Sequence, residues 1–285
     1  MMKSNILKAM HNMTIYGSNE LLRFYVGNNR ANNMGDALEI FVKDIFCNSF
    51  SFTDEEALKK YSETFSYLGN ASNPPDIIIK GGDAIEVKKI EGFSSLALNS
   101  SYPKQKLYSN STMITNACKH CEDDIGGWTE KDLIYFVGNV SKNKLKCLTI
   151  IYGDCYSATD EIYSRIKNKI KTGVEEINGI EFIHTNEIGK LKKVDPLGIT
   201  DLRIRGMWHI ENPRKVFNYI IDKYYKENSE MNVFLILKRE KYNSFDIEDR
   251  KLVEENPFLS IEDIKIKNPD NPANLIDAKL ISYHI

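Results

Sequence analysis

The chain has 285 residues, 42% of them hydrophobic, and a formal net charge of −2. A chain of this length can bury a sizeable core, and its five cysteines, an odd number, indicate reduced thiols and not a disulfide-stapled scaffold. No apolar run approaches the roughly 18 residues of a membrane span and the first residues lack a secretory signal, so we expect a cytoplasmic protein without a membrane contact.

Helical spacing of apolar residues is clearest over residues 34–46, where Leu38 and Ile45 fall on one face and Asp36 lies close to the start. Three more helices are predicted, over residues 112–121, 159–171 and 213–225. The last of these begins with Pro213, a residue suited to the first helical turn.

Strand-like apolar runs alternate with these helices. They cover residues 76–80, 83–90, 132–140, 147–153, 180–184, 233–238, 264–267 and 278–285. The runs 132–140 and 147–153 are almost continuously apolar and are joined by a polar turn, which is typical of strands covered on both faces. The alternation predicts an α/β fold with a mixed β-sheet flanked by helices. Because no linker composition interrupts the chain, we expect one domain over residues 1–285, with a core of about 30–195 and a C-terminal extension of about 196–285.

Chemistry-bearing side chains gather in the predicted hairpin "PPDIIIKGGDAIEVKK". The double glycine suits a tight turn, and alternation along the second strand places Glu86 and Lys88 on one side, where Asp76 of the first strand can join them. Two converging carboxylates repel each other, and a hard cation such as Mg²⁺ relieves the repulsion. A lysine beside such an ion suits phosphodiester hydrolysis, because it can stabilise developing charge while the metal activates water. The residues alone leave open an amphipathic hairpin whose charges are merely solvated.

The order Pro-Asp, then nine residues, then Glu-x-Lys resembles the PD-(D/E)xK signature of a nuclease superfamily that includes many restriction enzymes. That fold has a helix before the hairpin that often supplies another acid, and Glu39 in the helix 34–46 is a candidate. The segments "NRANNMGDALEIFVKDIF", "GGDAIEVKKIE" and "IKIKNPDNPANLIDAKLI" also resemble the NgoPII group of type II restriction endonucleases. The segment "CEDDIGGWTEKD" has no clear place in that pattern.

The resemblance implies a restriction-endonuclease-like core and a Mg²⁺-dependent homodimer that cuts double-stranded DNA at the palindrome GGCC. It also implies a cognate DNA methyltransferase that acts on the same site. The catalytic positions would be Asp76, Glu86 and Lys88, with the metal held by Asp76, Glu86 and the main-chain carbonyl of Val87. The neighbouring Lys80, Asp83, Lys89 and Glu91 need no catalytic function and are expected to be solvated or close to DNA. The alternatives are a DNA-binding protein of the same fold that does not cut, and a nuclease of another specificity.

Guanine offers two major-groove acceptors, for which arginine and lysine are the usual partners. Arg203 and Arg205 would share a face if their segment is a strand, in the C-terminal extension that we expect to contribute to DNA recognition. Phosphate contacts by the same arginines are an equally good interpretation. A polar, basic segment shortly after the catalytic strand supplies further candidates for DNA contact, Asn99, Ser101, Lys104 and Lys106.

Overall fold

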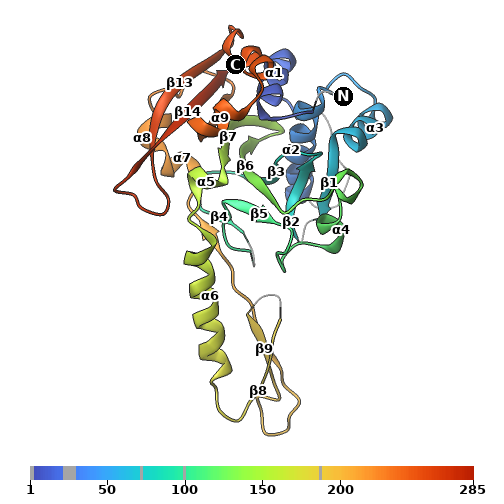
Figure 1. Cartoon of the computed structure of the whole chain (residues 1–285), viewed down its shortest axis with the longest axis vertical. Helices are drawn as coiled ribbons and strands as arrows, with labels where there is room; N and C mark the ends of the chain where they lie inside the picture. The colour runs from blue at the N-terminus through green and yellow to red at the C-terminus, as the bar shows by residue number, and fades with distance from the viewer. Residues whose placement is uncertain (1–2, 22–29, 71–72, 99–100, 186–187) are drawn as a thin grey trace.

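The computed structural model describes residues 3–21, 30–70, 73–98, 101–185 and 188–285, with only the backbone described for residues 30–35 and 70. A body built around one large sheet carries an arm that extends away from it (Figure 1). The helices are α1 (Ile6–Tyr16), α2 (Arg30–Cys47), α3 (Asp54–Thr64), α4 (Asn116–Lys119), α5 (Gly153–Tyr156), α6 (Asp160–Glu175), α7 (Pro213–Val216), α8 (Asn218–Ile221), α9 (Arg239–Ser244) and α10 (Ile247–Glu254). The strands are β1 (Phe65–Asn70), β2 (Asn73–Ile79), β3 (Ala84–Ile90), β4 (Leu96–Ala97), β5 (Lys106–Tyr108), β6 (Glu130–Ser141), β7 (Lys144–Tyr152), β8 (Glu181–Ile183), β9 (Gly189–Lys192), β10 (Leu202–Ile204), β11 (His209–Ile210), β12 (Asn232–Lys238), β13 (Leu259–Lys267) and β14 (Leu275–His284).

The predicted mixed sheet is confirmed. Its strand order is β1-β2-β3-β6-β7-β12-β14-β13, and β5 pairs with β6 beside this path. The pairs β3/β6 and β7/β12 are parallel, whereas the other neighbours along the path are antiparallel. The C-terminal strands β12 to β14 therefore extend the same sheet that holds the hairpin β2–β3.

Helix α2 covers one face of the centre of this sheet, as its apolar stripe predicts. Leu38 and Ile45 are fully buried, and the ring of Phe46 packs edge-on against Phe136 of β6. A Cβ on Gly138 would lie 2.6 Å from Leu38 Cδ2, so only glycine at this point of β6 lets the helix approach so closely. The same packing fixes the position of the strand β3 beneath the helix.

Two predicted helices are shorter than expected. The segment 112–121 is helical only in α4, which begins after the capping side chain of Thr115. The segment 213–225 divides into α7 and α8 at Phe217, whose backbone leaves helical geometry (φ −106°, ψ 21°) while its side chain is buried in the core. Here burial of one aromatic ring outweighs helical periodicity.

The structure also contains elements that the periodicity did not predict, among them the helices α1, α3, α5, α9 and α10 and the strands β1, β4, β5, β9 and β11. Helix α3 carries a capping box in which Thr53 and Glu56 bond each other's main chain, a signal that was readable in the sequence. Within the described part of the chain, no helix is long and apolar enough to cross a membrane.

The arm consists of α6 and a separate three-stranded sheet of order β10-β9-β8 (Figure 1). At its base, β11 pairs with β4, the strand that follows β3 in the chain. The pairing of β11 with β4 therefore connects the arm to the segment that follows the hairpin β2–β3 in the chain.

Candidate active site

The hairpin β2–β3 brings the predicted catalytic residues together. Ile77 pairs with Ile85 and Ile78 with Ala84, and the turn between the strands uses a positive φ of 63° at Gly81. The described pairing does not reach Asp76, and there the main-chain N–H of Val87 donates to Asp76 Oδ2 at 2.6 Å. The carboxylate of Asp76 is thereby held against β3.

Glu86 and Lys88 lie on the same side of β3, with Lys88 Nζ 2.6 Å from Glu86 Oε1. The other carboxylate oxygen, Glu86 Oε2, is buried and has no hydrogen-bond partner among the described residues. Burial, followed by repulsion from Glu86, raises the pKa of the Asp76 carboxyl to about 8. Asp76, Glu86 and Lys88 are thus one electrostatically coupled cluster.

The environment keeps Lys88 charged. Burial by itself would lower the pKa of this lysine, but the carboxylates of Glu86 and Asp76 outweigh it and the pKa is raised. Lys88 is therefore an ammonium donor at neutral pH and not a general base.

Glu39 of α2 lies close enough to contribute to the raised pKa values of both Asp76 and Lys88. Its carboxylate is paired with Lys43, one turn further along the helix, at 2.7 Å. Glu39 therefore borders the cluster, and it forms an ion pair with Lys43 on its own helix.

The cluster fits a hard divalent cation. A buried carboxylate oxygen without a partner is costly, and a metal ion would satisfy it. No group of three or more His, Cys, Asp or Glu side chains in the described residues is arranged to hold a metal. A cation at this site would accordingly take the two carboxylates of Asp76 and Glu86 and complete its shell with main-chain oxygen, such as that of Val87, and water.

Glu122, which the sequence analysis did not single out, stabilises the hairpin β2–β3. Glu122, in the segment "CEDDIGGWTEKD", accepts hydrogen bonds from the main-chain N–H of Gly81 at 2.7 Å and from Ser66 Oγ at 2.8 Å. Lys131 pairs with Glu122 at 2.8 Å and also donates to the carbonyl of Gly82 at 2.9 Å. Both members of the pair are almost completely buried. The segment without a clear place in the family pattern thus holds the turn between β2 and β3.

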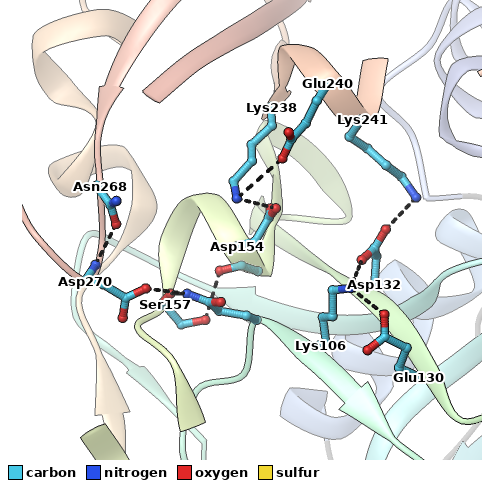
Figure 2. A network of polar contacts seen from close by, with 12 residues as sticks. Lys106, Glu130, Asp132, Asp154, Ser157, Lys238, Glu240, Lys241, Asn268 and Asp270 are labelled. Atoms are coloured by element: carbon cyan, nitrogen blue, oxygen red, sulfur yellow. Dashed lines mark hydrogen bonds and ion pairs between the residues drawn. The ribbon is translucent and has the colours of Figure 1, made fainter. Parts of the chain in front are cut away.

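The expectation that Asp83 is solvated is wrong. Asp83 is buried, and it accepts hydrogen bonds from Tyr152 Oη at 2.7 Å and from Lys241 Nζ at 2.9 Å. Lys241 also pairs with Asp132 at 2.7 Å, and Figure 2 shows Asp132 between Lys241 and Lys106. This network joins the beginnings of β3 and β6 to α9.

The predicted DNA contacts lie in different environments. Lys104 is buried with its ammonium group 4.0 Å from the centre of the Tyr102 ring, a position that does not suit a direct DNA contact. Lys106 pairs with Glu130 at 2.6 Å. Ser101 is partly exposed, and Asn99 lies outside the described residues. Arg203 in β10 and Arg205 just after it are exposed on the arm.

The raised pKa of Asp76 predicts how stability depends on pH. In the unfolded chain this carboxyl has a pKa of about 3.9, so between that pH and the folded value the folded protein binds more protons. The stability contributed by Asp76 is full at low pH and is lost as the pH rises through the folded pKa. We expect urea unfolding in the presence of a chelator to show a larger loss of stability between pH 5 and 8 in the parent protein than in Asp76→Asn. Equal pH dependence of the two proteins would contradict the raised pKa.

The chain is similar to known restriction endonucleases over most of its length. The sequence profile of the family described as NgoPII restriction endonuclease matches residues 4–267. The type II restriction enzyme NgoPII of Neisseria gonorrhoeae is 52% identical over 262 residues, which cover 90% of this chain and 91% of that protein. No solved structure matches.

Proposed function

Because the chain belongs to the NgoPII restriction endonuclease family, we propose that Asp76, Glu86 and Lys88 form its catalytic site and cut double-stranded DNA at GGCC with Mg²⁺. The family membership makes the chain a type II site-specific deoxyribonuclease with DNA as its substrate, and such enzymes generally need a divalent metal. The observation that carries the assignment of the site is the buried, unpartnered Oε2 of Glu86 beside Asp76 and Lys88.

A divalent cation held by the carboxylates of Asp76 and Glu86 would supply Lewis-acid chemistry, which would polarise the scissile phosphate and lower the pKa of the attacking water. The protein itself orients the two carboxylates and the lysine of the site. The N–H of Val87 holds the Asp76 carboxylate against β3, and Glu86 presents its unpartnered oxygen to the same point. Lys88, held in its charged form, donates to the attacking water or to a phosphate oxygen and stabilises the negative charge that develops there. Glu39 is a candidate additional acid at the border of this cluster.

The partners follow from the same assignment. A palindromic site is matched by a protein with two-fold symmetry, so we propose a homodimer. A cognate methyltransferase would modify the same site and need not bind this protein. Residues 196–285 are proposed to contribute to DNA recognition through Arg203 and Arg205, with Ser101 and Lys106 as further candidates closer to the catalytic strand. A restriction enzyme meets its DNA in the cytoplasm, where we expect this chain to act.

A digest of a sequenced plasmid tests the specificity. With Mg²⁺, the purified protein is expected to produce discrete fragments whose ends map to GGCC, and methylation of that site is expected to prevent cutting. Fragment ends at another sequence would reject GGCC while leaving the nuclease in place. Absence of any cutting with Mg²⁺ would point to another divalent metal or to a protein that binds without cleaving, and a repeat with Mn²⁺ separates these two outcomes.

A further inference from the structure

The arm contains a helix with an uncovered apolar face. No side chain of α6 is buried against the residues that the structure describes, although the helix is strongly amphipathic. Ile162, Ile166 and Ile170 recur at every fourth residue and are 37%, 43% and 45% exposed. Ile177, two residues beyond the helix end, is also 43% exposed. Helices in proteins derive most of their stability from packing such a face, so we expect another surface to pack against these isoleucines.

We infer that the isoleucine stripe of α6 packs against α6 of a second copy of this chain, so that the two arms form the dimer interface. The inference deepens the proposed function, because it names the surface through which the nuclease would dimerise. Two features favour a second copy over another occupant: the charges that border the stripe, and the attachment of the arm to the catalytic strand.

In an antiparallel pair of α6 helices, charged residues beside the stripe of one copy would lie near oppositely charged residues of the other copy. At about 100° per residue, Arg165, Lys169 and Glu176 border one side of the isoleucines. A two-fold axis midway between Ile170 and Gly173 leaves Arg165 of one copy about 3 Å along the helix axis from Glu176 of the other, within reach of the two long side chains, and does so twice. The same axis sets Ile166 against Ile177. A Cβ at Gly173 would meet no atom within 4 Å, so the surface there is open to a close approach by Ile170 of the other copy.

The arm offers apolar surface beyond the stripe. Its helix of 16 residues is about 24 Å long. The arm has further apolar surface at its tip, where Leu197 and Ile199 are 81% and 79% exposed. This tip is ordered by its own hydrogen bonds, because Asp195 Oδ1 accepts from the N–H groups of Ile199 and Thr200 at 3.1 and 2.6 Å.

The attachment of the arm links this interface to catalysis. Strand β4 follows β3 closely in the chain and pairs with β11, which follows the arm. Joining two arms by a two-fold axis would therefore hold two catalytic strands at a fixed separation. A palindromic substrate requires such an arrangement, with one site for each DNA strand.

Sedimentation of the full-length protein without DNA tests the inference. We expect a dimer at micromolar concentration, and we expect Ile166→Glu combined with Ile170→Glu to raise the dimer dissociation constant more than about 100-fold. Because both isoleucines are exposed in the single chain, the circular dichroism spectrum of this variant should stay unchanged, which would show that the fold is intact. The matched control is Leu58→Glu, which places the same charge at an exposed aliphatic residue of α3 and should leave the dimer intact.

A charge exchange tests the antiparallel geometry. Arg165→Glu and Glu176→Arg should each weaken the dimer about tenfold, whereas the two changes together should restore it. A monomeric parent protein at tens of micromolar, or a dimer that survives the double isoleucine change, would overturn the inference. Cleavage assays keep the two proposals apart. A dimer that does not cut DNA would reject the proposed function alone, and a cutting enzyme that stays dimeric without the isoleucines would reject this interface alone.

Discussion

Replacing Lys88 by methionine is expected to lower the rate of DNA cleavage by about 1,000-fold while binding of the same DNA is retained. Methionine keeps the apolar stem of the lysine but removes the ammonium group that lies 2.6 Å from Glu86. That group is held charged by Glu86 and Asp76, so its loss removes stabilisation of the transition state more than binding of the substrate. Single-turnover cleavage of a short duplex, with a gel-shift assay of the same duplex, measures the two effects separately.

The adjacent lysine provides a matched control. Lys89 points to the other side of β3 and pairs with Glu91 at 2.5 Å, so Lys89→Met removes a charge from the same strand without touching the cluster. We expect its cleavage rate to stay within about threefold of the parent. Asp76→Asn should resemble Lys88→Met and should also lose its response to added metal. Full activity in either Lys88→Met or Asp76→Asn would reject the proposed mechanism.

The second large effect concerns stability. Lys131→Met should destabilise the protein by about 3–5 kcal/mol, because it leaves the Glu122 carboxylate buried without its positive partner. Glu122 accepts a hydrogen bond from the main chain of Gly81, so we expect the change to destabilise the turn that joins β2 and β3. Urea unfolding followed by circular dichroism gives the change in the free energy of unfolding.

Two further variants define this effect. Glu122→Gln combined with Lys131→Met removes both charges, and we expect it to recover part of the lost stability. Lys60→Met breaks the exposed pair of Lys60 with Glu63 and should cost less than about 1 kcal/mol. If Lys131→Met and Lys60→Met had equal effects, the buried pair would not be the brace that its geometry indicates.

The sequence alone determined the features that depend on local pattern. Alternation along a strand puts Glu86 and Lys88 on one side whatever surrounds them, and the double glycine suits a turn that brings Asp76 back beside them. The stripe of Leu38 and Ile45 likewise predicted α2, because a helical period of apolar residues has one simple interpretation. The order of helices and strands was sufficient to predict a mixed sheet.

Only the tertiary structure decided which distant residues support that site. Glu122 is 41 residues from Gly81, and nothing in its own segment indicates that it closes the hairpin turn. Lys104 lies in a basic, polar segment typical of a DNA contact, yet the fold buries it against Tyr102. The stripe on α6 was visible as a helix but not as an uncovered surface, since exposure depends on what the rest of the chain packs against. Local geometry follows from neighbouring residues, whereas burial, ion pairing and free surface follow from contacts between residues far apart in the chain, which no single stretch of sequence contains.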